Sequence, residues 1–130
     1  MRRPHPTLTP QELAIMKVVW RLDTATVRDV YETLRAERSI AYTTVMTMMR
    51  ILEDKGHVRH EDDGVRFIYI PAVARQTARK SALRHLVDTF FDGSSAKAVA
   101  ALLGGEGSGI SDDELQRIAE LVNNARSDLR

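Results

Sequence analysis

The chain has 130 residues, with 19 lysine and arginine side chains against 18 aspartate and glutamate side chains, and no cysteine. This length predicts one compact domain, or one small domain with an appended element, because a separate core rarely forms below about 40 residues. The absence of cysteine excludes disulfides, thiolate metal ligands and cysteine nucleophiles. No apolar stretch approaches the roughly 20 residues of a membrane span. These features are compatible with a cytoplasmic protein.

The formal net charge of +1 conceals an uneven distribution along the chain. Residues 1–60 carry ten basic and seven acidic side chains, and residues 72–100 carry five basic and two acidic ones. Residues 61–71 and 101–130 hold the acidic excess. A nucleic-acid-binding protein is usually more basic overall, so any such function has to rest on the basic segments.

The N-terminal segment predicts an arm followed by a helix. Residues 1–7 contain two prolines and two arginines without periodicity, which is typical of a mobile arm. Thr9 then supplies an N-cap, Pro10 stands at the first helical position, and Glu12 completes a capping box. Apolar residues at helical spacing continue the pattern to about residue 20.

Two more helices follow. Thr26 with Asp29 three positions later indicates the start of a second helix, which is expected to end near residues 36–38. A third helix is predicted from about Ala41 to Lys55. Gly56 is the expected residue just beyond its C-terminus.

After Gly56 the apolar residues alternate with polar ones at a spacing of two, which predicts a β-hairpin. Residues 57–61 and 65–70 flank Asp62-Asp63-Gly64, and Asp-Gly between β-rich segments is a hairpin signal. We expect a two-residue turn at Asp63-Gly64, with Pro71 ending the second strand. This register predicts that Val58 lies opposite Tyr69, His60 opposite Phe67, and Glu61 opposite Arg66.

The remaining chain is predicted to be helical. Residues 73–91 carry apolar side chains in helical register, and a short helix is expected to begin at Ser94 or Ser95. The glycine-rich residues 104–109 lack the Gly-Lys-Ser/Thr ending of a phosphate-binding loop and are interpreted as a linker. Ser111 is the expected cap of the last helix.

Three helices followed by a hairpin is the order of a winged helix-turn-helix module. The expected fold is therefore mainly α with a small β-hairpin wing. We expect residues 1–7 to form a flexible arm, residues 8–71 a winged helix-turn-helix domain that binds DNA, and residues 72–130 a helical dimerisation region.

The third helix carries the most informative surface. Thr43, Thr47, Arg50 and Asp54 lie opposite its apolar stripe, with Thr44 on the flank. Threonine offers a hydroxyl group to base edges or phosphates and a methyl group to thymine, and arginine reaches guanine or a phosphate. The alternative is an ordinary solvated face. Threonine is a poor helix former, however, so propensity alone does not explain its repeated use here.

Residues 41–56, Ala41-Tyr42-Thr43-Thr44-Val45-Met46-Thr47-Met48-Met49-Arg50-Ile51-Leu52-Glu53-Asp54-Lys55-Gly56, resemble the recognition helix of the BlaI/MecI penicillinase repressor family. The segments at residues 8–13, 19–20, 26–30, 69–71 and 110–115 are also similar to that family. The resemblance covers roughly residues 8–125 and is most specific at Thr44-Val45-x-Thr47.

The resemblance implies a homodimeric transcriptional repressor that binds a palindromic operator through its winged helix and dimerises through its C-terminal helices. It also implies a membrane-bound sensor with a zinc peptidase domain as a possible partner, and no cofactor. The expected DNA contacts are Tyr42, Thr43, Thr44, Thr47, Arg50, Arg28, Lys55 and Arg66, with Arg59 as a second donor in the wing. The expected dimer contacts are Leu83, Leu86, Val87, Phe90, Leu103, Leu115 and Ile118.

This sequence also departs from the family. Ile51 stands where members often have arginine, and the Asn-Phe bond that is cleaved in staphylococcal members has no counterpart. The copper-responsive relatives sense metal through cysteines, which this chain lacks.

The sequence leaves two alternatives open. A winged helix can bind protein instead of DNA, and the C-terminal helices can fold back on their own chain instead of on a second copy. His57 and His60 lie at strand positions of opposite parity, which disfavours a shared metal ion. No serine has a paired base in the sequence, so we expect no enzyme activity.

Overall fold

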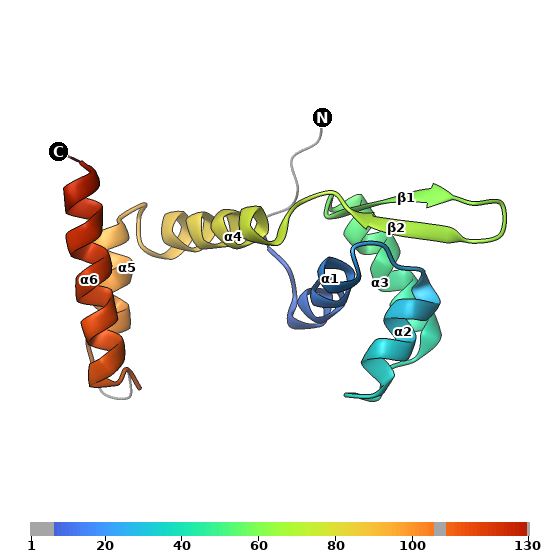
Figure 1. Cartoon of the computed structure of the whole chain (residues 1–130), viewed down its shortest axis with the longest axis horizontal. Coiled ribbons are helices and arrows are strands. Elements are labelled where there is room, and N and C mark those ends of the chain that lie inside the picture. Colours follow the sequence, from blue (N-terminus) through green and yellow to red (C-terminus); the bar gives the residue numbers. More distant parts are fainter. Residues whose placement is uncertain (1–6, 106–108, 130) are drawn as a thin grey trace. The chain divides into compact units, whose positions relative to one another are not determined.

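The computed structural model describes residues 7–105 and 109–129. Most of the predicted arm, residues 1–6, lies outside the described residues, as do residues 106–108 of the predicted linker. The elements in chain order are α1 (Pro10–Leu22), α2 (Val27–Arg35), α3 (Tyr42–Asp54), β1 (Val58–Asp62), β2 (Phe67–Pro71), α4 (Arg75–Phe90), α5 (Ser95–Leu103) and α6 (Asp112–Asp128) (Figure 1). The mainly α fold with one hairpin is confirmed.

The chain divides into two compact units, Met1–Leu86 and Val87–Arg130. The division falls within α4, so that this helix begins in the first unit and ends in the second. The functional boundary expected between residues 71 and 72 stays a prediction.

The first two helices of the first unit begin at side-chain caps. Thr9 and Glu12 form a capping box at α1, and Thr26 and Asp29 form another at α2, as the sequence predicts. At the C-terminal end of α3, Gly56 adopts a positive φ of 86°. The backbone amide of His57 then donates a hydrogen bond to the Leu52 carbonyl oxygen. A glycine at this position ends a helix without the strain that a Cβ introduces.

Substituting Thr26 by alanine is expected to lower the free energy of unfolding by about 1–2 kcal/mol. Thr26 is buried, and its hydroxyl group accepts a hydrogen bond from the Asp29 amide, which is left without this partner in the variant. Urea denaturation followed by circular dichroism measures the change. Thr24→Ala is the matched control, because Thr24 is exposed and precedes the cap; equal losses in both variants would contradict the capping role.

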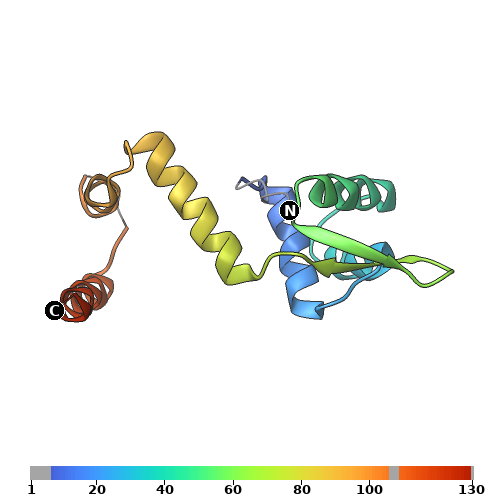
Figure 2. The ribbon, with the colours of Figure 1, turned by 90° about the horizontal axis from the view of Figure 1, so that it is seen from above.

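The core of the first unit forms where α1, α2, α3 and the hairpin meet. Its buried apolar residues are Ile15, Met16, Val18, Val19, Ala25, Val30, Leu34, Val45, Met49, Leu52, Val58 and Tyr69. Tyr69 in β2 exchanges backbone hydrogen bonds with Ala25 in the α1–α2 connection, at 2.8 and 3.0 Å. This bridge ties the hairpin to the helices and so fixes where the wing leaves them. The hairpin tip extends beyond α1–α3 in two perpendicular views (Figure 2).

The predicted hairpin register is wrong by two residues. His60 pairs with Tyr69 and Glu61 with Ile68, whereas the two-residue turn placed them opposite Phe67 and Arg66. The observed loop spans residues 63–66, because the Asp63 carboxylate accepts hydrogen bonds from the amides of Val65 and Arg66. The full observed register is Val58 with Pro71, Arg59 with Ile70, His60 with Tyr69, Glu61 with Ile68, and Asp62 with Phe67.

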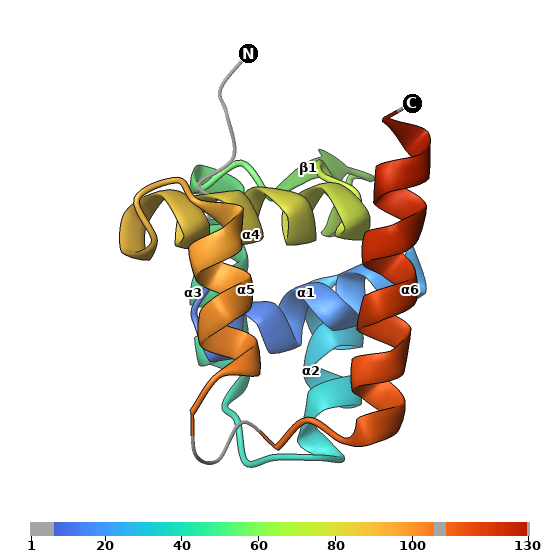
Figure 3. The ribbon, with the colours of Figure 1, turned by 90° about the vertical axis from the view of Figure 1, so that its left-hand side faces the viewer.

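In the second unit, α5 and α6 run in opposite directions (Figure 3). Ser94 and Ser111 cap them through hydrogen bonds to the amides of Lys97 and Glu114, as expected from the sequence. Neither helix contains a buried residue. Large apolar side chains are therefore exposed along both helices: Val99, Leu102, Leu103, Leu115, Leu121 and Val122.

The side chains expected at a dimer interface are mostly uncovered in the single chain. Leu83, Leu86, Phe90, Leu103 and Leu115 are exposed, and Ile118 is half-buried. Val87 differs from this expectation, because it is only 3% exposed within its own chain and has little surface left for a partner.

Candidate nucleic-acid interface

Helix α3 has two faces of different chemistry. Val45, Met49 and Leu52 are buried in the core, which fixes the rotation of the helix about its axis. The opposite side chains, Thr43, Thr47, Arg50 and Asp54, are all exposed, and Thr44 is half-buried beside them. The structure thus brings the polar stripe expected from the sequence together on one exposed face.

The N-terminus of α3 lacks the side-chain cap that α1, α2, α5 and α6 have. Ala41 occupies its N-cap position and makes no side-chain hydrogen bond to the first turn. Amide groups at an uncapped helix start can donate to an anion, which the helix dipole also favours. Sequence reasoning missed this feature, although alanine at a cap position was a visible signal.

Two residues expected to contact DNA lie together beside this helix start. The Arg28 guanidinium group of α2 lies 5.7 Å from the centre of the Tyr42 ring, at the first residue of α3. Tyr42 also packs edge-on against Tyr31, with ring centres 5.5 Å apart. Arg28 is largely exposed and pairs with Glu32 at 3.3 Å, which is a surface pair that it can exchange for another anion at little cost.

The C-terminal end of α3 contacts the hairpin through a histidine. His60 Nδ1 lies 2.6 Å from Glu53 Oε2, and the His60 ring stacks on Phe67 with centres 4.2 Å apart. These contacts hold the wing against the last turn of α3. No local sequence pattern predicts the Glu53–His60 pair, because the pair depends on how the helix and the hairpin pack. His57 is buried.

The tip of the wing is acidic, and the two arginines of the wing each lie near a carboxylate. Arg59 contacts Glu61 at 3.1 Å, and Arg66 lies 3.7 Å from Asp63. Backbone hydrogen bonds from Arg66 and Val65 hold the pKa of Asp63 below its ordinary value, because they stabilise the charged carboxylate. Both arginines remain more than half exposed, and the exposed carboxylates beside them weaken the attraction of the tip for phosphates.

Lys55, also expected to contact DNA, has a structural partner. Its ammonium group lies 2.8 Å from Glu12 Oε1, and Glu12 is 2% exposed. Burial raises the pKa of Glu12, but hydrogen bonds from Lys55 and from the amide and hydroxyl groups of Thr9 together bring it below its ordinary value. Lys55 therefore neutralises a buried carboxylate that links α1 to the end of α3.

Residues 8–124 match the sequence profile of the family described as penicillinase repressor. The chain belongs to this family.

No helix within the described residues has the length and apolar character needed to span a membrane.

Two curated relatives are themselves named as regulators of this kind. The Penicillinase repressor of Bacillus licheniformis is 25% identical over 117 residues, which is 90% of each chain. The Transcriptional regulator BlaI of Mycobacterium tuberculosis is 35% identical over 95 residues, covering 59% of this chain and 69% of the relative. Both names describe repression or regulation.

A solved structure matches the fold. The Bacillus licheniformis BlaI monomeric form, determined in complex with the blaP half-operator, superposes with a TM-score of 0.50 and 26% sequence identity. The match covers 59% of this chain and 93% of that chain.

Proposed function

We propose that this penicillinase repressor family member is a sequence-specific, DNA-binding transcriptional repressor that acts as a homodimer. The observation that carries the proposal is the exposed face of α3, where Thr43, Thr47 and Arg50 project away from a helix whose other face is locked into the core. A helix held in this way can insert its polar side chains into the major groove in a fixed orientation.

The DNA contacts divide by chemistry. Thr43, Thr44, Thr47 and Arg50 are placed to contact base edges. Tyr42, Arg28, Arg66 and the uncapped amides of α3 are placed to contact phosphates and so set the register. The similarity to BlaI bound to a half-operator supports DNA as the partner of this chain. Lys55 contributes mainly through Glu12 and the fold.

Dimerisation follows from the exposed apolar side chains of α4, α5 and α6. Short helices without a buried face are marginal in water, and most helical stability comes from packing of an apolar face. The proposed contacts are Leu83, Leu86, Phe90, Leu103, Leu115 and Ile118, and a second copy of the chain can cover them. Two α3 helices related by a two-fold axis match a palindromic operator.

A dimer bound at a promoter blocks transcription from that promoter. The proposed location of the protein is the cytoplasm. Dissociation of the dimer releases the DNA because one winged helix alone binds weakly. A membrane-bound sensor with a zinc peptidase domain is the proposed source of the releasing signal. The competing function is a winged helix that binds protein. The threonine-rich face of α3 disfavours it, because the buried centre of a protein interface is richer in large apolar side chains.

The test is to enrich genomic DNA fragments on the purified protein and to footprint the bound sites. We expect a two-fold symmetric site upstream of a gene. Affinity should fall with salt, with a log–log slope of about −0.9 for each phosphate neutralised. A flat salt response, or fragments without a common sequence, would support the protein-binding alternative.

Thr47→Ala is expected to weaken operator binding by about 1–3 kcal/mol and to leave binding to unrelated duplexes nearly unchanged. Thr47 is exposed in the middle of the proposed base-contacting face. Competition titration with operator and scrambled duplexes measures both affinities. Thr24→Ala, on the α1–α2 connection, is the control. An equal loss on both duplexes would mean that Thr47 positions the protein and does not read sequence.

A further inference from the structure

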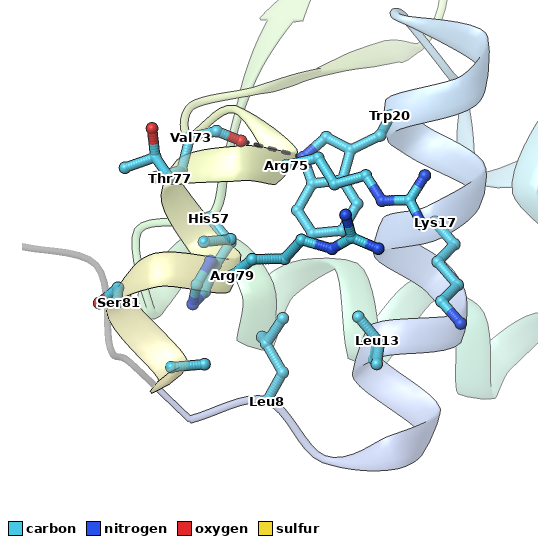
Figure 4. A pocket seen from close by; sticks show the side chains of 12 residues that line it. Leu8, Leu13, Lys17, Trp20, His57, Val73, Arg75, Thr77, Arg79 and Ser81 are labelled. Carbon is cyan, nitrogen blue, oxygen red and sulfur yellow. Dashed lines mark hydrogen bonds between the residues drawn. The ribbon is translucent and has the colours of Figure 1, made fainter. Parts of the chain in front are cut away.

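A pocket of about 600 Å³ lies within the first unit, away from the exposed face of α3. Its walls come from α1, from the segment that precedes α1, from the first turns of α4 with Val73 before them, and from His57 between α3 and β1 (Figure 4). Leu8, Leu13, Trp20, Val73 and Ala78 supply apolar surface. This volume is within the range of pockets that hold small organic ligands.

The charged residues that line the pocket are all cationic. Lys17 comes from α1, and Arg75 and Arg79 extend from α4 toward it. No carboxylate lines the pocket. Within the described part of the chain, none of these three cations has an ion-pair partner among the salt bridges of the structure. The cations are thus available to bind an anion.

Trp20 is held in place inside this pocket. Its indole Nε1–H donates a hydrogen bond to the Val73 carbonyl oxygen at 2.9 Å, which satisfies the polar edge of the ring. The ring is half-buried against the core, and its exposed part is left for apolar contact with a ligand. Trp20 is also the only tryptophan in the sequence, which makes its fluorescence a reporter for this site.

We propose that this pocket binds a small amphipathic carboxylate, with its apolar body on Trp20 and the leucines and its carboxylate among Lys17, Arg75 and Arg79. Guanidinium groups bind carboxylates in bidentate geometry, and such charge-assisted hydrogen bonds are stronger than neutral ones. The N-terminal residues 1–6 are a poor alternative occupant, since they carry Arg2 and Arg3 and no acidic residue. The proposal does not depend on DNA binding.

The experiment titrates the full-length protein with decanoate below its micelle concentration and follows Trp20 fluorescence, with calorimetry as a second measurement. Acetate tests the headgroup alone, decanol the apolar body alone, and decylammonium the opposite charge. We expect saturable decanoate binding at sub-millimolar concentration, and binding of the three controls at least tenfold weaker. Absence of saturation, or equal binding of decanol or decylammonium, would overturn the proposal.

Two pocket variants and one control locate the site. Arg79→Glu should weaken decanoate binding at least tenfold because it removes a cation, and Ala82→Leu should weaken it because the larger side chain fills the pocket; both positions are exposed. Lys80→Glu makes the same charge change at the next residue, which does not line the pocket, and should alter affinity less than twofold. Equal losses of decanoate affinity in Arg79→Glu and Lys80→Glu would show that binding depends on the overall charge of the protein. This result would contradict binding in the pocket.

Discussion

Replacing Leu86 and Phe90 together by aspartate is expected to turn the protein into a monomer at micromolar concentration and to weaken operator binding at least about hundredfold. Leu86 is 44% exposed and Phe90 is 72% exposed in the single chain. Full burial of a large apolar side chain contributes about 1.5–3 kcal/mol. Only the exposed part of each side chain is left to bury, but both copies in a dimer lose it. The total loss is therefore roughly 3–6 kcal/mol, which corresponds to at least about a hundredfold change.

Sedimentation velocity measures the oligomeric state, and titration with operator duplex measures the affinity. Val65→Asp is the matched control for sedimentation, since Val65 is 91% exposed at the hairpin tip and the substitution also exchanges an apolar side chain for a charge. This control should remain dimeric. A wild-type monomer, or a double variant that still dimerises, would show that the helices α4–α6 bury their apolar faces in another way.

Lys55→Met is expected to lower the free energy of unfolding by about 2–4 kcal/mol. The substitution leaves the Glu12 carboxylate, which is almost fully buried, without the ammonium group at 2.8 Å. Breaking a buried pair from one side is costly because the remaining charge stays desolvated. Lys97→Met is the control: it breaks the exposed pair with Asp92, and surface pairs of this kind contribute at most about 1 kcal/mol.

The double variant Glu12→Gln with Lys55→Met isolates the interaction free energy between the two side chains from the effect of each substitution alone. If the loss comes from the stranded carboxylate, the double variant should be more stable than Lys55→Met alone. Chemical denaturation of the four proteins in the cycle measures the coupling. A double variant that loses the sum of both single effects would contradict the pairing.

The same pair predicts how stability depends on pH. The folded-state pKa of Glu12 lies below its ordinary value of 4.5, so this group stabilises the protein above that pH. The stabilisation is lost as the pH falls below 4.5 and through the lower folded-state value. In Lys55→Met the contribution should shrink or reverse, because burial alone raises the pKa of Glu12.

The helices and the polar face of α3 could be predicted because their signals are local. Thr9 and Thr26 sit at caps with the acidic residue three positions later, and Val45, Met49 and Leu52 repeat at helical spacing. These patterns depend on residues within one or two turns of each other. They also determined which side chains of α3 would face away from the core.

Features that depend on competing or distant contacts could not be predicted. The Asp63 side chain bonds to two amides beyond it, and this four-residue loop replaced the expected two-residue turn. The partners of Lys55 and His60 lie 43 and 7 residues away and meet only after the helices and hairpin pack. Periodicity predicts that Val87 is a dimer contact, but periodicity does not distinguish burial within a chain from burial between chains.

The central claim is that two copies of α3 lie in the major groove of one operator. Because the chain has no cysteine, Asp54→Cys introduces a single thiol on the exposed stripe of α3, to which an iron chelate can be attached for local DNA cleavage. On the operator we expect two clusters of cuts, symmetric about its centre and about one helical turn, 10–10.5 base pairs, or a multiple of it apart. A single cluster, or no cleavage while the protein remains bound, would contradict the account.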